Sequence, residues 1–252
     1  MKIVVTVKQV PDPNSVTVLE SDNTLSREKE VVLDPGDECG IEEGLQLKEA
    51  HGGEVILVSM GPERAKDALR KGLSMGADRG ILISDAQLAG ADALLTAKAL
   101  AAAIKPEAPD LVICGTESYD GSTGMVPPML AELLGMPQLT VAKKVVVEGS
   151  TIKIHRQTAD GYQLVEAATP VLITVTAGIA EPRYASLKGI MAARSKEIKQ
   201  IGLGDLGIER AEPAETIEGL TEAETRKAGA IIQEDGTAVD RIIQVLVDAK
   251  VL

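Results

Sequence analysis

Short apolar runs alternate with longer segments of helical periodicity over the first half of the chain. The runs typical of strands are 3–7, 54–59, 80–83 and 111–114, and the segments typical of helices are 38–51, 63–75, 92–104 and 126–134. Each strand run is almost continuously apolar instead of alternating, which is the pattern of parallel strands covered on both faces. The order of strands and helices therefore predicts a doubly wound, mostly parallel α/β sheet.

The pattern changes after residue 140. Strand-like runs at 141–147, 152–157, 163–167 and 171–175 follow one another without helices between them. A polar turn at 148–150 separates the first two runs. This order predicts antiparallel strands added to the parallel sheet.

Beyond residue 200 the chain is acidic and has little apolar periodicity up to Thr225, so it is expected to be extended. A final helix is predicted at 237–249, with an apolar stripe formed by Val239, Ile242, Ile243, Leu246 and Val247. The stripe can pack on the chain's own domain or on a partner, and the pattern leaves both open. We therefore expect an α/β domain at 1–200 and a C-terminal extension at 201–252.

The amino-acid composition argues against some classes of function. The 252 residues are 44% hydrophobic, so a sizeable core can form, but it must be aliphatic because there are no Phe or Trp residues and only three Tyr residues. The net charge of −12 argues against a general nucleic-acid binder, which needs a basic surface. No run of about 18 apolar residues indicates a membrane span, and the start of the chain does not resemble a signal peptide, so a cytoplasmic protein without membrane insertion is expected.

The two cysteines, Cys39 and Cys114, are far apart and form no metal or redox motif. They are interpreted as ordinary reduced thiols. The two histidines, His51 and His155, fall in a predicted helix end and in a strand, and no acidic residues cluster with them at ligand spacing. The sequence therefore predicts no catalytic residues, no metal site and no redox group of its own.

The segment with most chemical information is the loop after the strand at 111–114. The strand ends at Gly115, a polar loop with Asp120–Gly124 follows, and a helix begins near Met125 or Val126. Ligands of open α/β sheets bind beyond the carboxyl ends of the strands, and a helix N-terminus suits a phosphate. Gly121 and Gly124 allow close approach of the backbone. The loop matches neither G-x-G-x-x-G nor the P-loop, however, and by itself is equally typical of a helix cap.

Several segments together resemble the beta subunit of electron transfer flavoproteins. They are VVTVKQVPD, VVLDPGDECGIEEGLQLKE, VSMGPERAKDALRKGLSMGADRGI, ICGTESYDGSTG and EPRYASLKGIMAAR, in that order along most of the chain. The resemblance implies a Rossmann-like adenine-nucleotide-binding fold that pairs with a larger alpha subunit. It implies FAD mainly on the alpha subunit, near the interface, and a structural AMP in the beta subunit.

The resemblance also implies an electron carrier instead of an enzyme. Such heterodimers take electrons from dehydrogenases, for example the acyl-CoA dehydrogenases of fatty-acid β-oxidation, and pass them to a membrane quinone oxidoreductase. Two alternatives stay open. One is an electron-bifurcating beta subunit with a second FAD in place of AMP, and the other is a stand-alone adenine-nucleotide-dependent enzyme. The content of FAD and AMP distinguishes the first alternative, and ATP turnover by the chain alone distinguishes the second.

By position, the resemblance assigns nucleotide contacts to the ends of strands and to two loops. These residues are Thr6, Asp34, Pro35, Gly36, Asp37, Met60, Gly115, Asp120, Gly121, Ser122, Thr123, Gly124, Met125 and Val126. The common AMP branch has an Asn in place of Asp34, and larger polar residues in parts of the 121–126 loop. The smaller residues of this chain imply more contacts from backbone N–H groups.

The resemblance further implies a protruding recognition loop at about 180–195 whose leucine, here Leu187, inserts into the partner dehydrogenase. The residues assigned to docking are Arg183, Tyr184, Leu187, Lys188, Ile190 and Met191. Arg183, Lys188 and Arg194 are expected to surround the leucine as a basic patch that attracts acidic partners. Without the resemblance, a solvated basic turn is the alternative interpretation.

Overall fold

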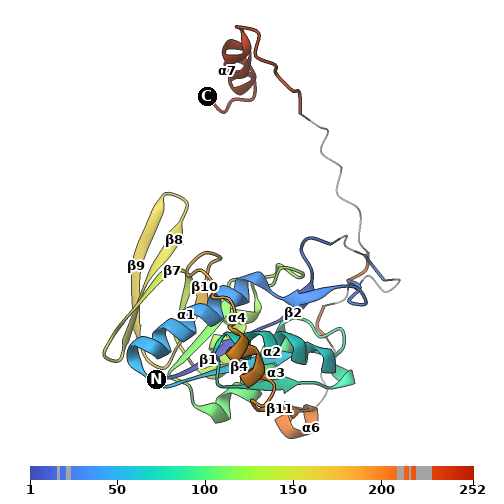
Figure 1. The fold of residues 1–252 in the computed structure, drawn as a ribbon, viewed down its shortest axis with the longest axis vertical. Coiled ribbons are helices and arrows are strands. Elements are labelled where there is room, and N and C mark those ends of the chain that lie inside the picture. The colour runs from blue at the N-terminus through green and yellow to red at the C-terminus, as the bar shows by residue number, and fades with distance from the viewer. Residues whose placement is uncertain (16–17, 21–23, 209–212, 216, 220–228) are drawn as a thin grey trace. The chain divides into compact units, whose positions relative to one another are not determined.

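The computed structural model describes residues 1–15, 18–20, 24–208, 213–215, 217–219 and 229–252. The chain divides into two compact units, Met1–Glu218 and Gly219–Leu252. The first unit contains the predicted α/β sheet, and the second contains the final helix (Figure 1).

The described residues of the first unit form one nine-stranded sheet with the order β11-β5-β4-β1-β6-β10-β7-β8-β9. All neighbours from β11 to β7 are parallel, and β8 and β9 continue the sheet as antiparallel strands. The strands are β1 Lys2–Thr6, β4 Glu54–Met60, β5 Arg79–Ile83, β6 Leu111–Gly115, β7 Gln138–Glu148, β8 Thr151–Thr158, β9 Gly161–Ala168, β10 Val171–Val175 and β11 Ile198–Ile201. A separate antiparallel pair is formed by β2 Gln9–Pro11 and β3 Val31–Leu33.

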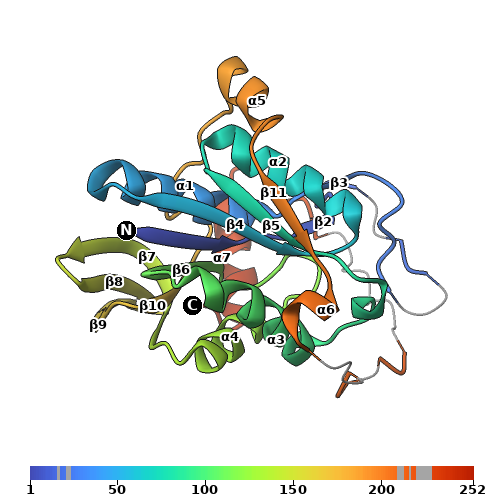
Figure 2. The same cartoon turned by 90° about the horizontal axis from the view of Figure 1, so that it is seen from below.

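Helices cover both faces of this sheet, which confirms the doubly wound α/β fold (Figure 2). On one face lie α1 Pro35–His51 and α2 Lys66–Met75, and on the other lie α3 Ala93–Ile104 and α4 Val126–Leu134. The shorter elements are α5 Leu187–Ala193, α6 Leu203–Leu206 and the 3₁₀ turns Glu63–Ala65, Ala86–Leu88 and Lys105–Glu107. Helix α1 begins three residues before its predicted start because Asp34 caps its N-terminus and Pro35 suits its first turn.

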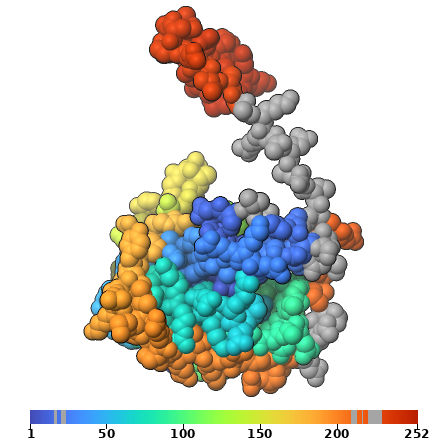
Figure 3. Space-filling view, turned by 45° about the vertical axis from the view of Figure 1, so that its right-hand side comes forward, coloured from blue at the N-terminus to red at the C-terminus, as the bar shows by residue number. Residues whose placement is uncertain are grey.

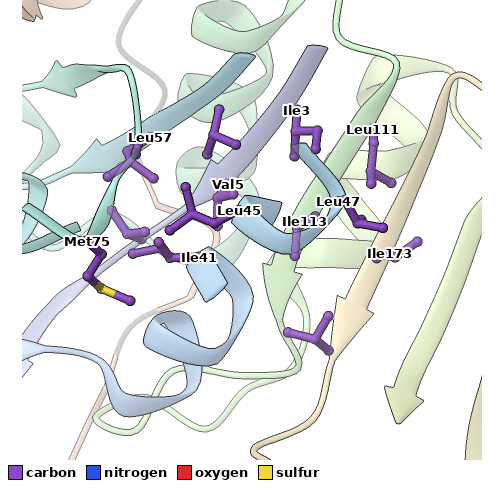
Figure 4. Packing of buried hydrophobic residues seen from close by; sticks show 14 of the residues in the cluster. Ile3, Val5, Ile41, Leu45, Leu47, Leu57, Met75, Leu111, Ile113 and Ile173 are labelled. Atoms are coloured by element: carbon purple, nitrogen blue, oxygen red, sulfur yellow. The ribbon is translucent and has the colours of Figure 1, made fainter. Parts of the chain in front are cut away.

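The core is aliphatic on both faces of the sheet. Ile3 and Val5 of β1 point to α1 and α2, where Ile41 and Leu45 pack against them (Figure 4), and Val4 between them points to the opposite face. All three tyrosines, by contrast, are exposed. Both cysteines are buried, and burial raises the pKa of Cys114 to about 12, so this thiol stays protonated.

One part of the predicted topology is wrong. The run 171–175 was expected among the antiparallel strands, but β10 is parallel to β6 on one side and to the start of β7 on the other. Strand β7 then continues beyond β10 as the first strand of the antiparallel β7–β8–β9 extension of the sheet. The change of partner coincides with register shifts in β7 and with a positive φ of 60° at Val141, whose N–H donates to the Thr174 hydroxyl.

The predicted final helix is confirmed as α7, Ala238–Asp248. Its apolar stripe is exposed: Val239 is 65% exposed, and Ile242 and Ile243 are each 47% exposed. The stretch predicted to be extended contains the short helix α6, while residues 209–212, 216 and 220–228 lie outside the described residues. Among the helices of the described residues, none has the length and apolar character needed to cross a bilayer.

Helix α1 carries a buried carboxyl group, Glu43, next to Glu42. Burial, with a smaller contribution from the Glu42 charge, raises the pKa of Glu43 to about 7. Because this folded-state pKa exceeds the unfolded value of about 4.3, stability is greatest at low pH and falls as the pH rises towards 7. We expect Glu43→Gln to raise the free energy of unfolding by about 2 kcal/mol more at pH 8 than at pH 5.

Denaturant unfolding at the two pH values checks this expectation. The exposed Glu132, replaced by Gln in the same way, is the control and should change the unfolding curves equally at both pH values. A stabilisation by Glu43→Gln that is independent of pH would show that the Glu43 carboxyl does not titrate near neutrality in the folded protein.

Candidate functional site

Three of the residues predicted to contact a nucleotide lie side by side at one edge of the sheet. Thr6 ends β1, Met60 ends β4 and Gly115 ends β6, and the strand order places β1 between the other two. The chain leaves β1 for β4 on one side and returns to β6 on the other, so the order of strands reverses at this point. Such a switch point at the carboxyl ends of parallel strands is where open α/β sheets bind ligands.

Two buried carboxyl groups fix the N-terminus of α1 at this edge. Asp34 accepts hydrogen bonds from Gly36 N at 2.9 Å and from Tyr119 N at 2.7 Å. Asp37 accepts from Lys8 N at 2.7 Å and from the backbone of Gly115, so it joins the ends of β1 and β6. Burial and the nearby Asp34 raise the pKa of Asp37 well above its usual value, and these two backbone N–H groups oppose the shift.

Both carboxyl groups already accept hydrogen bonds from protein backbone. Residues 34–37 are therefore better suited to hold the surrounding loops in place than to bind a ligand through their side chains. Any nucleotide contact from Pro35 or Gly36 would come from the backbone, since neither side chain carries a polar group.

The loop between β6 and α4 presents an unusual amount of free backbone. Gly124 has a φ of 61°, and the place where its Cβ would stand is 3.8 Å from the nearest heavy atom, the Thr116 carbonyl oxygen. Within the described residues, the backbone N–H groups of Gly121, Thr123, Gly124 and Val126 have no protein acceptor. Ser122, also at a positive φ, donates its N–H to the Ser118 carbonyl at 2.8 Å and so closes the loop. Neighbouring free N–H groups of this kind suit an anion such as a phosphate.

The N-terminus of α4 contributes fewer donors than the sequence suggested. The helix begins at Val126 as predicted, but Pro127 and Pro128 have no N–H group, and Met129 N donates to the Met125 carbonyl at 3.2 Å. Met125 N approaches the Thr123 hydroxyl oxygen at 3.4 Å. The loop, and not the first turn of the helix, therefore supplies most of the donors.

Asp120 is enclosed by two cations that the sequence pattern did not identify. Its carboxylate forms ion pairs with Lys8 Nζ at 2.7 Å and with the Arg27 guanidinium, and its side chain is only 3% exposed. Burial acts to raise the pKa of Asp120, but Lys8 and Arg27 outweigh it, so the pKa is lowered and the carboxylate stays charged. Lys8 stands two residues after the end of β1, so its place at this edge could have been predicted, whereas nothing in the sequence around Arg27 indicates its role.

A cavity of about 260 Å³ opens beside Tyr119 and Asp120, and its other walls come from the segments around 11–15 and 25–30. None of the remaining predicted nucleotide residues lines it. The predicted nucleotide site is thus an open edge of the sheet adjoining this cavity, not an enclosed chamber.

A second group of predicted residues lies on the surface beside α2, at 184–194, which we call the docking segment (Figure 3). Its large apolar side chains face solvent: Tyr184 is 95% exposed, Leu187 76%, Met191 65% and Ile190 45%. Lys188 and Arg194 are exposed as well. Exposed apolar residues gathered in one short segment are typical of an interaction site.

Arg183 differs from its predicted role. It was expected to belong to the basic patch that surrounds Leu187, but its guanidinium pairs with Glu42 and Glu49 of α1. Of the three cations assigned to this patch, Lys188 and Arg194 have no ion pair within the part of the chain that the structure describes, whereas Arg183 attaches the segment to α1. The pairing could not be seen in the sequence because its partners lie more than a hundred residues away in the chain.

Comparison with known proteins adds to this geometry. Residues 22–206 match the electron transfer flavoprotein domain. Electron transfer flavoprotein subunit beta of Mycobacterium bovis is 41% identical, with 99% of each chain covered. The protein of the same name from Thermoanaerobacterium thermosaccharolyticum is 42% identical over 84% of this chain and 82% of its own, and that from Megasphaera elsdenii is 35% identical over the full length of both.

Proposed function

The chain belongs to the electron transfer flavoprotein family as a beta subunit, and we propose that it carries electrons only as part of a heterodimer, in which it binds a structural nucleotide and docks dehydrogenases. The four free N–H groups of the 121–126 loop are the observation that carries the nucleotide part of this proposal. They lie at the switch point of the sheet, where an adenine nucleotide can direct its phosphate into the loop.

AMP fits this edge better than a ligand that needs charged side chains. Asp34, Asp37 and Asp120 are committed to protein partners, so the phosphate would be bound mainly by backbone donors of Gly121, Thr123, Gly124 and Val126. The cluster of Lys8, Arg27 and Asp120 carries a net charge of about +1, which favours an anion nearby. Thr6 and Met60, at the ends of β1 and β4, border the same edge.

FAD supplies the electron-accepting chemistry when bound, mainly on the alpha subunit near the interface. The residues of this chain bind and orient instead: the loop holds the nucleotide, and the docking segment brings a dehydrogenase, such as an acyl-CoA dehydrogenase, close to the heterodimer. Electrons then pass towards a membrane quinone oxidoreductase. A second FAD in the loop site is the outcome that would assign the chain to the bifurcating branch.

The C-terminal extension, residues 201–252, is proposed to pack on the alpha subunit through the stripe of α7. Four of the five apolar residues of this stripe are exposed and Leu246 is half-buried, which is unfavourable in water for an eleven-residue helix. We expect Ile243→Asp to reduce copurification of the tagged chain with the alpha subunit at least tenfold, because it would bury a charge in an apolar interface. The measurement is the ratio of the two subunits after affinity purification.

Gln244→Asp is the matched control, because it adds the same charge one residue further on, where the side chain faces away from the stripe. It should leave the subunit ratio unchanged. Equal recovery of the alpha subunit with Ile243→Asp, or a stable functional chain without any partner, would contradict the proposed packing.

A further inference from the structure

The docking segment is attached to the body of the domain at its entry, in its middle and at its exit. At the entry, Arg183 binds Glu42 in a bidentate arrangement, with Nε at 2.7 Å from Oε2 and an Nη atom at 2.9 Å from Oε1. Both Nη atoms of Arg183 also contact the carboxylate of Glu49, two turns further along α1, one of them at 3.1 Å. The backbone N–H of Arg183 also donates to Glu42 at 3.2 Å.

Glu42 is well placed for this role. Its side chain is only 5% exposed, and Gln46 donates a further hydrogen bond to it at 2.8 Å. An arginine fork on a buried, hydrogen-bonded carboxylate fixes direction as well as position, which a single flexible cation does not. The chain therefore enters the docking segment from a defined point on α1.

In its middle, the segment touches α2 backbone to backbone. A Cβ on Gly189 would stand 2.4 Å from the Ser74 carbonyl oxygen near the end of α2, so only glycine permits this approach of α5. At the exit, one cation from α2 and one from the chain after α5 each bind backbone carbonyl oxygens of the other. Arg70 of α2 donates to the carbonyl oxygens of Ala193 and Lys196, and Lys196 Nζ donates to those of Leu73 at 3.1 Å and Ala77 at 2.5 Å.

These attachments matter because the segment has little internal stability. Helix α5 has seven residues, too few to be stable alone in water, and most of its large side chains are exposed. Without the attachments, a partner would have to order this segment as it binds, and the ordering would weaken the complex.

We propose that Arg183, with the Gly189 contact, is a positioning residue for dehydrogenase recognition: it holds the docking segment in its binding conformation before the partner arrives. The proposal rests on the docking function proposed above. Arg183 acts through Leu187 and does not itself form the interface. Its loss should lower affinity for the donor dehydrogenase and leave the electron-transfer step within the complex unchanged.

The experiment measures flavin reduction in the purified heterodimer as a function of dehydrogenase concentration. Arg183→Gln and Gly189→Ala should each raise the half-saturating concentration about tenfold with the same limiting rate. Gly189→Ala removes no charge and supports or refutes the proposal by itself if Arg183→Gln does not fold. Reduction by dithionite should be normal in both variants.

Arg79 provides a matched control, since it also bridges two glutamates, Glu54 and Glu107, and its ion pairs involve neither the docking segment nor α1 or α2. Arg79→Gln should lower the melting temperature without changing the half-saturating concentration. In a Leu187→Ala background, Arg183→Gln should have almost no further effect on affinity, because it acts through that side chain.

The outcomes separate the two proposals. If Leu187→Ala weakens coupling but Arg183→Gln and Gly189→Ala do not, the positioning role is wrong and the docking function stands. An undiminished effect of Arg183→Gln in the Leu187→Ala background also overturns the positioning role. If Leu187→Ala itself has no effect, the docking function fails, and the positioning role fails with it.

Discussion

Replacing Leu187 by alanine is expected to weaken electron transfer from the dehydrogenase about thirtyfold while the melting temperature and flavin content stay unchanged. Truncating a buried leucine usually costs about 2–5 kcal/mol of stability. Leu187 is 76% exposed, so little of that cost applies. As the central apolar anchor of an interface, the same side chain can contribute about 2 kcal/mol to binding, which corresponds to the thirtyfold change in affinity.

The measurement is the concentration dependence of dehydrogenase-coupled flavin reduction beside a melting curve. Leu164 of β9 is the matched control, because it is 72% exposed and lies outside the docking segment. Leu164→Ala should leave stability and coupling unchanged. Early unfolding of Leu187→Ala would show that the leucine stabilises the fold, and normal coupling would show that the segment does not recognise that dehydrogenase.

Replacing Gly124 by valine is expected to abolish retention of the nucleotide. The φ of 61° disfavours any β-branched residue, and the new side chain would occupy the open space above the free N–H groups of the loop. Both effects remove the anion-binding arrangement at the 121–126 loop. Because AMP has no redox role, the heterodimer should lose stability more than it loses the capacity of its flavin to be reduced.

Gly149→Val is the control that distinguishes the effect of backbone strain from the loss of nucleotide binding. Gly149 lies in the β7–β8 turn with a φ of 62° and nothing within 4 Å of its missing Cβ, so Gly149→Val imposes nearly the same backbone strain away from the site. Both variants should lose about 1–2 kcal/mol of stability from that strain. Only Gly124→Val should lose the nucleotide, as measured by chromatography of the denatured protein. Equal nucleotide content in the two variants would place the nucleotide elsewhere.

The parallel part of the fold could be predicted because its signals are local. Continuous apolar runs identified β1, β4, β5 and β6, and the helix from Val126 to Leu134 ends at Gly135, whose φ of 66° is that of a C-terminal cap. The direction of β10 could not be predicted, since the apolar pattern of a buried strand is the same whichever way its neighbours run.

The short elements have too few residues to show a hydrophobic periodicity in the sequence. Strands β2, β3 and β11 have three or four residues each, and α5 depends on contacts with α2 instead of on its own sequence. Long-range pairs such as Arg183 with Glu42 leave no local pattern at all. The lack of N–H groups at Pro127 and Pro128, however, was visible in the sequence. It could have predicted that the loop before the helix, and not the helix itself, supplies most of the hydrogen-bond donors.

The nucleotide content of the copurified heterodimer decides whether this chain binds a structural AMP beside the FAD of the complex. The complex would be purified through a tag on this chain, denatured, and its released nucleotides separated and quantified against protein. We expect one FAD and one AMP per heterodimer. Two FAD without AMP, or a heterodimer that retains no nucleotide besides a single FAD, would contradict it.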